Sequence, residues 1–284
     1  MLDNLKIAII GPGVMGKAIT SSLINTGKVD PKNIVIAGPN LDRIDSLSRE
    51  FGVIGLSDNV EAVREADIVI LAVKPQRLEQ ASKSVKNKLK TDVLVISIIA
   101  GASLATLVEK LGAHQIVRAM PNTASQIGMG ITVWAKTEHV SEKMKIIASE
   151  VIQTLGEEVF VEDESYLDMA TALSGTGPAY VFLFMEAMID AGVHLGFPRR
   201  IAEKLVVQTI RGSTEFYLQN HEHPARLRNE VTSPGGTSAE ALYYLEKAGF
   251  RTAISRAIWA AYERSIELGK GKNKQVVDEK NKTD

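Results

Sequence analysis

The chain has 284 residues, 45% of them hydrophobic, and a formal net charge of -1. This composition fits one or two globular domains with a substantial core and gives no basic surface of the kind that nucleic acid requires. The absence of cysteine excludes disulfides and thiolate chemistry and suits the cytoplasm. No signal peptide is recognisable, and the longest continuous apolar runs, 68–73 and 93–102, are far shorter than the ~20 residues that span a bilayer. We therefore expect a cytoplasmic protein that does not bind membranes or metals.

The most informative stretch is residues 7–16. Four consecutive apolar residues run directly into Gly11-Pro12-Gly13-Val14-Met15-Gly16, and an apolar-periodic segment follows at 17–24. The run predicts a strand buried on both faces of a parallel sheet, and the glycine spacing predicts a dinucleotide site. Gly11 allows a tight turn, Gly13 lets the backbone approach a pyrophosphate, and Gly16 lets the next helix pack closely on the strand. The simpler alternative is a tight strand–helix turn without a ligand.

The second expected strand covers 33–37 and bears on cofactor preference. Gly38, Pro39 and Asn40 follow it, so no carboxylate stands where NAD-preferring sites usually hold the ribose 2′-hydroxyl. Arg43 is near enough to meet a 2′-phosphate, although Asp42 could take its place after one helical rotation, and Arg43 could be a solvated surface charge. The pattern favours NADPH over NADH.

Further strand-like runs at 68–73, 93–98 and 115–120 alternate with helix-like segments at 78–89 and 103–111. This alternation predicts a right-handed, mostly parallel, doubly wound sheet whose ligand lies at the carboxyl ends of the strands. Asn122 and Thr123 would then meet the nicotinamide end, and Lys74 would meet phosphate or substrate unless it is simply solvated. Segments 130–135 and 158–161 look like edge strands that close the domain.

From about residue 165 the pattern becomes helical throughout. Segment 168–196 is rich in apolar and small residues and is broken once, at 174–178, where Pro178 fits the first turn of a new helix. Gly196-Phe197-Pro198 marks a stop and a restart, and 201–218 and 252–268 read as amphipathic helices. Residues 180–195 are apolar on nearly all sides, which predicts either the core of a large bundle or burial against a second subunit. Because only ~100 residues remain, we favour an intimate homodimer.

A second glycine-rich stretch lies at 230–240. Thr237 and Glu240 have capping-box spacing, so a helix is expected to begin there. Gly235 and Gly236 would expose backbone N–H groups at its start, forming an anion cradle suited to a small carboxylate, with the hydroxyls of Thr237 and Ser238 beside it. Alternatively, the two glycines form a plain turn and both hydroxyls are caps.

No Ser-His-Asp set, carboxylate pair or metal-ligand spacing stands out in the sequence, and none of the five histidines falls within these motifs. Two anion sites in separate domains suggest a cofactor at one and a carboxylate substrate at the other. Hydride transfer to an already activated electrophile, such as an iminium carbon, needs little beyond positioning and a hydrogen bond to nitrogen.

Over residues 5–268 the chain resembles the 1-pyrroline-5-carboxylate reductases of proline biosynthesis. The motifs that carry the resemblance are Gly11–Gly16, Ala72-Val-Lys-Pro75, Met120-Pro-Asn-Thr123, Leu173-Ser-Gly-Thr-Gly-Pro-Ala-Tyr180 and Val231-Thr-Ser-Pro-Gly-Gly-Thr-Ser238. The resemblance implies NAD(P)H-dependent reduction of the cyclic imine to L-proline. It also implies an α/β fold with an N-terminal Rossmann domain (1–162), an all-α dimerisation and substrate domain (163–270), and homodimers that often assemble into decamers. Beyond these domains the sequence is mostly charged and polar, which predicts a flexible tail (271–284).

The resemblance also implies roles for individual residues. Backbone amides of Thr237 and Ser238 would hold the substrate carboxylate, the Ser238 hydroxyl would bond the ring nitrogen, and Glu164 is a further substrate-side candidate. Many members carry Thr where this chain has Ser238, which keeps the hydroxyl but leaves its rotamer less fixed. The expected substrate residues are Ser233, Gly235, Gly236, Thr237, Ser238 and Glu164, with Thr237 and Ser238 catalytic. The expected cofactor residues are Gly11, Pro12, Gly13, Val14, Met15, Gly16, Asn40, Arg43, Asn59, Val73, Lys74, Pro75, Ala100, Asn122 and Thr123.

Two other functions fit part of the sequence. A β-hydroxyacid dehydrogenase has a similar two-domain layout, but its catalytic Lys and Asn would fall at Val181 and Met185, which leaves an alcohol–ketone reaction without its acid and base. A dinucleotide-sensing protein would explain the first glycine turn but would leave the stretch 234–238 without a purpose.

Overall fold

The computed structural model describes residues 2–269, which form two compact units. The first unit comprises the chain up to Thr176 together with the segment from Ala260, and the second is Gly177–Trp259. The first unit therefore extends beyond the 1–162 segment expected for the Rossmann domain. The expected tail, 271–284, lies outside the described residues.

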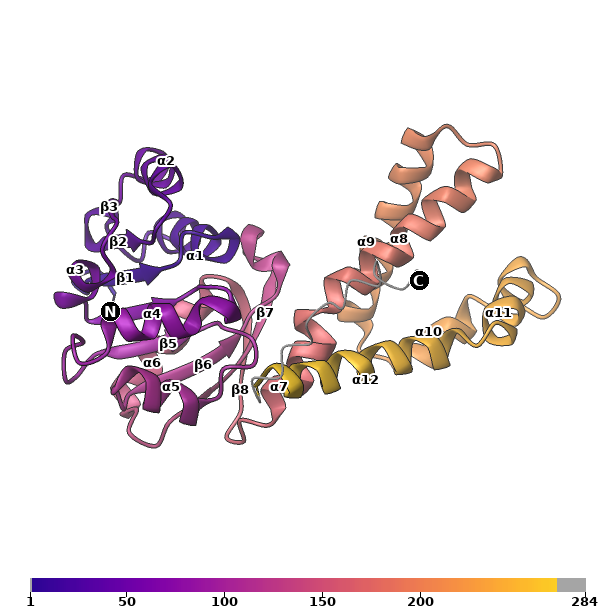
Figure 1. Cartoon of the computed structure of the whole chain (residues 1–284). Helices are drawn as coiled ribbons and strands as arrows, with labels where there is room; N and C mark the ends of the chain where they lie inside the picture. The colour runs from indigo at the N-terminus through magenta and orange to yellow at the C-terminus, as the bar shows by residue number, and fades with distance from the viewer. Residues whose placement is uncertain (1, 270–284) are drawn as a thin grey trace, which may run out of the picture. The chain divides into compact units, whose positions relative to one another are not determined.

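The first unit is built on an eight-stranded sheet with the order β3-β2-β1-β4-β5-β6-β7-β8 (Figure 1). β6 and β7 pair antiparallel, and the other neighbouring strands pair parallel. The strands are β1 (Ile7–Ile10), β2 (Ile34–Ala37), β3 (Ile54–Leu56), β4 (Ile68–Leu71), β5 (Leu94–Ser97), β6 (Ile116–Met120), β7 (Gly130–Lys136) and β8 (Gly156–Phe160). This is the predicted doubly wound architecture.

Helices cover both faces of the sheet. α1 (Val14–Asn25), α2 (Leu41–Phe51) and α6 (Glu142–Gln153) contribute to one apolar core, and α3 (Asn59–Arg64), α4 (Leu78–Val85) and α5 (Leu104–Leu111) contribute to the other. Strand side chains alternate between the cores, as in β1, where Ile7 and Ile9 face one and Ala8 and Ile10 the other. Burial of both strand faces explains why the sequence shows continuous apolar runs here instead of alternation.

Three local predictions about the first unit need correction. β7 is not an edge strand, because it lies between β6 and β8, and the opposite edge is formed by β3, which the sequence did not reveal. Gly55 interrupts the apolar run of β3, and a Cβ there would lie 2.4 Å from the Ser48 hydroxyl of α2. α4 ends at Val85 instead of residue 89, and Asn87 just beyond it adopts φ 60°, a left-handed conformation that ends a helix.

The predicted break at 174–178 and the new helix at Pro178 are confirmed, and the segment before the new helix is a π-helical turn. α7 (Tyr166–Ala170), the π-turn η4 (Thr171–Gly175) and α8 (Gly177–His194) follow one another, and the Thr176 N–H donates to the Thr171 carbonyl at 2.8 Å. Pro178 is the second residue of α8, where its missing N–H costs no helical hydrogen bond.

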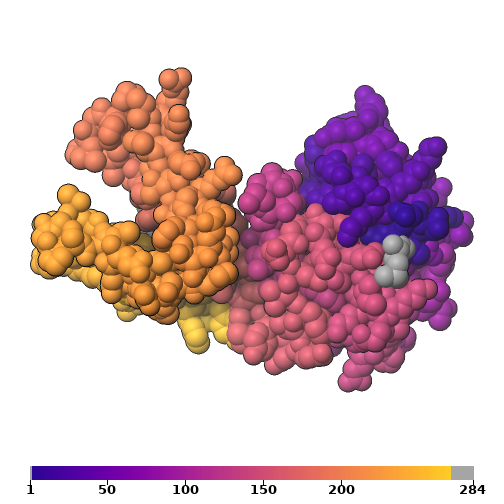
Figure 2. Space-filling model, turned by 180° about the vertical axis from the view of Figure 1, so that it is seen from behind, coloured from indigo at the N-terminus to yellow at the C-terminus, as the bar shows by residue number. Residues whose placement is uncertain are grey.

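The second unit contains α8, α9 (Arg199–Asn220), α10 (Pro224–Glu230), α11 (Thr237–Lys247) and the first half of α12 (Phe250–Gly269). α8 and α9 form a hairpin in which a Cβ on Gly192 would lie 3.1 Å from the Ala202 Cβ. In the space-filling view of Figure 2, this hairpin and the α10–α11 segment project as separate arms of the unit. The predicted stop and restart at 196–198 is confirmed, with Gly196 at φ 110°.

None of the 18 residues of α8 is buried within the single chain. Phe182 is 60% exposed and Leu183 is 67% exposed. The helix is therefore not the core of an intrachain bundle, which was one of the two alternatives that its composition left open. A surface this apolar is typical of an interaction site.

The helical stretch Tyr166–His194 bears on the expectation about membranes. By length and composition it could cross a bilayer. Small and polar residues interrupt the segment, so it contains no long continuous apolar run. One such helix is weak evidence for a membrane span, since core helices of soluble proteins have the same length and composition.

Candidate functional site

The turn between β1 and α1 has the geometry that the glycine spacing predicts. Gly11 adopts φ 109°, and a Cβ there would lie 2.8 Å from the Ala72 carbonyl. A Cβ on Gly16 would lie 2.2 Å from the Gly11 oxygen, so any side chain would push α1 away from the strand. A Cβ on Gly13, by contrast, meets no atom of residues 2–269 within 4 Å. The open space at Gly13 is where a ligand could approach the backbone.

The start of α1 presents unpaired backbone donors. Gly13 is the N-cap and makes no side-chain cap, and the first helical hydrogen bond runs from the Lys17 N–H to the Gly13 oxygen at 2.9 Å. The N–H groups of Val14, Met15 and Gly16 therefore have no hydrogen-bond partner within residues 2–269. Together with the helix dipole they form a site for an anion such as a pyrophosphate.

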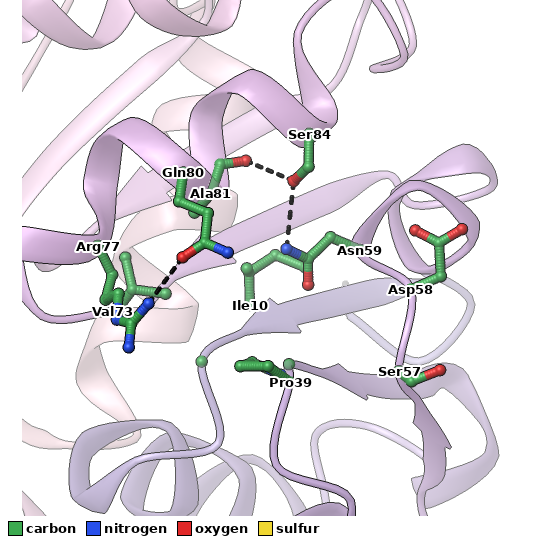
Figure 3. A pocket seen from close by; sticks show the side chains of 12 residues that line it. Ile10, Pro39, Ser57, Asp58, Asn59, Val73, Arg77, Gln80, Ala81 and Ser84 are labelled. Atoms are coloured by element: carbon green, nitrogen blue, oxygen red, sulfur yellow. Dashed lines mark hydrogen bonds between the residues drawn. The ribbon is translucent and has the colours of Figure 1, made fainter.

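A cavity of about 300 Å³ opens beside this turn, between α3 and α4 (Figure 3). We call it the α3–α4 cavity. It is lined by Ile10, Gly11, Gly38, Pro39, Ser57, Asp58, Asn59, Val73, Arg77, Gln80, Ala81 and Ser84. The cavity thus lies at the carboxyl ends of β1, β2 and β4, where a doubly wound sheet binds its ligand.

Asn59 and Ser84 are linked inside this cavity. The Asn59 amide nitrogen donates to the Ser84 hydroxyl at 3.2 Å, and that hydroxyl donates to the Ala81 carbonyl at 2.7 Å. The Asn59 Oδ1 atom is buried and has no hydrogen-bond partner among the described residues. An unpaired buried acceptor is costly and is typical of a site that a ligand completes.

At the end of β2, Asn40 and Arg43 have different roles. The Asn40 Oδ1 atom accepts the Arg43 N–H at 2.9 Å and so caps α2, which leaves the amide N–H₂ of Asn40 available. The Arg43 side chain is exposed and forms no ion pair within residues 2–269. A Cβ on Gly38 would lie 2.5 Å from the Pro12 ring, so this loop packs directly on the glycine turn.

The remaining cofactor candidates lie along the other strand ends. Val73 lines the α3–α4 cavity, whereas Pro75 and Ala100 line a second cavity of about 410 Å³ that the end of α12 closes. Lys74 is exposed and its side chain has no partner in the described part of the chain. The Asn122 Oδ1 atom accepts the Ile131 N–H at 3.4 Å and so shapes the turn in which Thr123 begins η3 (Thr123–Ile127).

The loop before α11 has nearly the same backbone conformation at its N-cap as the turn between β1 and α1. Gly236 is the N-cap with φ -83° and ψ 169°, close to the φ -85° and ψ -170° of Gly13, and it too makes no side-chain cap. The first helical bond runs from the Glu240 N–H to the Gly236 oxygen at 3.2 Å. The N–H groups of Thr237, Ser238 and Ala239 are left without partners within residues 2–269.

The predicted capping box is therefore wrong in detail. The helix does begin at Thr237, but Thr237 is its first residue and not its cap, so Glu240 lies one position too far along to complete the box. The hydroxyls of Thr237 and Ser238 form no hydrogen bond with the described residues. Gly235 requires φ 70°, and a Cβ on Gly236 would lie 2.6 Å from the Ser233 hydroxyl, so both glycines are needed for this loop.

Glu164 takes part in a partly buried charge cluster. Its Oε1 atom accepts hydrogen bonds from the Arg118 guanidinium at 2.8 Å and from the Leu104 N–H at 2.7 Å. Arg118 also bonds the Asp168 carboxylate at 3.0 Å, which accepts the Ser265 hydroxyl at 2.7 Å. Oε1 of Glu164 is thus already hydrogen-bonded within the protein. Through Arg118 and Asp168 the cluster links α7 and the end of α12 to β6.

Sequence reasoning missed five polar side chains of the α3–α4 cavity, namely Ser57, Asp58, Arg77, Gln80 and Ser84. Ser57 and Asp58 follow β3, the strand that was not predicted. Arg77, Gln80 and Ser84 lie beyond the motif around Lys74 and Pro75, and their spacing of three and four residues along α4 was the available signal.

Comparisons with known proteins agree with this architecture. Residues 164–268 match the family described as pyrroline-5-carboxylate reductase dimerisation, and residues 6–101 match the family described as coenzyme F420-dependent NADP oxidoreductase. The pyrroline-5-carboxylate reductase of Synechocystis is 42% identical over 94% of this chain and 99% of its own. The chain belongs to the pyrroline-5-carboxylate reductase family.

Further members of the pyrroline-5-carboxylate reductase family match over nearly the full length. The Methanosarcina acetivorans enzyme is 38% identical over 95% of this chain and 100% of its own. The crystal structure of Plasmodium falciparum pyrroline carboxylate reductase with NADP bound superimposes with a TM-score of 0.88, at 33% identity, over 95% of this chain and 100% of that one. The family resemblance read from the motifs is therefore confirmed.

Proposed function

We propose that the protein is a 1-pyrroline-5-carboxylate reductase, which reduces the cyclic imine to L-proline with NADPH, the last step of proline biosynthesis. The observation that carries this proposal is the pair of matching helix starts, at Gly13 and Gly236, in a chain of this family. Each offers three free N–H groups to an anion. One suits a dinucleotide pyrophosphate, and the other suits the carboxylate of a small substrate.

Two observations support binding of the cofactor to the first unit. The free space at Gly13 admits the pyrophosphate, and the unpaired Asn59 oxygen offers an acceptor near the ribose. The α1 start would hold the phosphates, with Pro12 and Val73 beside it. Asn40 and Asn59 would serve the ribose, and Lys74, Pro75, Ala100, Asn122 and Thr123 would line the path to the nicotinamide. When bound, the nicotinamide supplies the hydride.

At the second site, the N–H groups of Thr237 and Ser238 would hold the substrate carboxylate. Ser233, Gly235 and Gly236 shape the loop that aims these donors. The Ser238 hydroxyl, which has no partner in the described chain, would hydrogen-bond the imine nitrogen. Hydride addition at the carbon leaves that nitrogen needing one proton. A hydroxyl is too weak an acid to supply it, so Ser238 holds the nitrogen while water delivers the proton.

Arg43 supports a preference for NADPH. Its exposed guanidinium has no ion-pair partner within residues 2–269 and follows a strand end that carries no carboxylate. A 2′-phosphate would supply the missing partner, since guanidinium groups bind phosphate through several hydrogen bonds at once. NADH remains the alternative cofactor.

The exposed apolar surface of α8 supports a homodimer, in which a second copy covers that helix. A pentamer of dimers would be the larger assembly. We place the cofactor domain at 1–162 and the substrate and dimerisation domain at 163–270. A cytoplasmic location without membrane attachment follows from this proposal, because the dimer partner then accounts for the apolar helix.

The experiment is NADPH oxidation by the purified protein, with and without 1-pyrroline-5-carboxylate. Oxidation that requires the imine and yields proline supports the proposal. Oxidation with a β-hydroxyacid's ketone instead would identify a dehydrogenase of that class. Binding of NADPH without turnover of either compound would indicate a sensor.

A further inference from the structure

We propose that Arg77 and Gln80 form the adenine-binding end of the α3–α4 cavity, with the Arg77 guanidinium stacked on the base. This inference rests on the proposed use of a dinucleotide. It adds a second arginine to the cofactor site, with a role different from that of Arg43.

The hydrogen bond between the two side chains fixes how each faces the cavity. Arg77 Nη1 donates to Gln80 Oε1 at 2.8 Å. Because a guanidinium can only donate, Gln80 must turn its oxygen toward Arg77, which leaves its amide N–H₂ for the cavity. Figure 3 shows this arrangement, with Arg77 and Gln80 at one end of the cavity and Ser57 and Asp58 at the other.

The walls of this cavity suit a flat aromatic base. Ile10, Pro39, Val73 and Ala81 give it apolar sides. Adenine offers ring nitrogens that accept hydrogen bonds, which matches the free N–H₂ of Gln80. The planar guanidinium of arginine stacks well on aromatic rings, and the bond to Gln80 holds that plane in place.

The position along the sheet agrees with adenine. The α3–α4 cavity lies at the carboxyl ends of β1, β2 and β4, whereas Asn122 follows β6, two strands beyond β4 in the sheet. In a doubly wound sheet the adenosine ribose is held at the end of the second strand, which borders this cavity at Gly38 and Pro39.

The charge of the side chains that line the α3–α4 cavity disfavours a 2′-phosphate at Arg77. The cavity is lined by one basic side chain, Arg77, and by one carboxylate, Asp58, so its charged lining sums to zero. A phosphate dianion would gain little there. Arg43 stands outside that lining and carries no ion pair in the described chain, which makes it the better phosphate partner.

The test compares affinities of the full-length protein for NADPH and NADH by fluorescence titration, in wild type, Arg77→Lys, Arg77→Met and Gln80→Ala. Lysine keeps the charge but loses the planar group. We expect both Arg77 variants to weaken NADPH and NADH equally, by about 3-fold to 10-fold. Nicotinamide mononucleotide, which lacks adenine, should bind all variants alike. Arg43→Gln is the matched control and should weaken NADPH alone.

Three outcomes would overturn the proposal. If Arg77→Lys keeps its NADPH affinity while Arg77→Met loses NADPH selectively, Arg77 pairs with the phosphate. If neither variant changes either affinity, Arg77 is a surface residue. If Arg77→Met weakens nicotinamide mononucleotide as much as the dinucleotides, the contribution of Arg77 does not depend on adenine. Failure of the wild type to bind either dinucleotide would instead refute the proposed function, and this inference with it.

Discussion

Substitution of Gly13 by valine should separate cofactor binding from folding. Gly13 has φ -85° and ψ -170°, an extended conformation open to any residue, and its Cβ position is free of protein atoms within 4 Å. We therefore expect the stability of Gly13→Val to stay within about 1 kcal/mol of wild type. The valine methyl groups would fill the space through which a pyrophosphate reaches the α1 donors. Losing two charge-assisted hydrogen bonds of about 1.5–3 kcal/mol each weakens NADPH binding by about 100-fold or more.

The assay pairs a thermal melt with an NADPH titration. Gly16→Ala is the contrasting variant, because its Cβ would lie 2.2 Å from the Gly11 oxygen and only movement of α1 could relieve the overlap. It should lose about 1–3 kcal/mol of stability or more. A folded Gly13→Val protein with wild-type NADPH affinity would refute the assignment of the pyrophosphate to this turn.

Three other outcomes follow from the same structure. Light scattering at micromolar concentration should show a dimer for wild type and a monomer for Leu183→Glu. Met129→Glu, at an even more exposed apolar position of the first unit, should remain dimeric. A stable wild-type monomer would count against the dimer. Arg118→Met removes the cation that pairs with the partly buried carboxylates of Glu164 and Asp168. It should lower the free energy of unfolding, measured by denaturant titration, by about 2–4 kcal/mol. An unchanged denaturation midpoint would contradict this. Arg43→Ala should lower kcat/KM with NADPH and leave it unchanged with NADH, and an equal loss with both cofactors would reject the 2′-phosphate contact.

The sheet could be predicted because the apolar runs and the glycines in the sequence both indicate buried parallel strands followed by tight turns. Runs such as Ile68–Leu71 are apolar on both faces, and glycines mark the turn where the backbone has no room for a side chain. β3 could not be predicted, because three residues with a central glycine carry almost no periodic signal. Its position is set instead by contact with α2.

Other features depend on contacts that no local pattern encodes. The π-turn at Thr171–Gly175 is one, since nothing in its sequence distinguishes it from an ordinary helical turn. The Arg77–Gln80 pair becomes informative only once both side chains are seen to line one cavity. The ion pair between Glu164 and Arg118 joins residues 46 positions apart, so no local pattern predicts it.

The most direct measurement is kcat/KM for 1-pyrroline-5-carboxylate in wild type, Ser238→Ala, Ser238→Thr and Thr237→Ala. We expect Ser238→Ala to lose about 10-fold to 100-fold, the value of one or two hydrogen bonds, with its NADPH affinity nearly unchanged. Ser238→Thr should keep or raise the activity, because it retains the hydroxyl and stiffens its rotamer. Full activity in Ser238→Ala together with a loss in Thr237→Ala would move the role to the other hydroxyl. Full activity in both variants would contradict the proposed role of these hydroxyls at the α11 start.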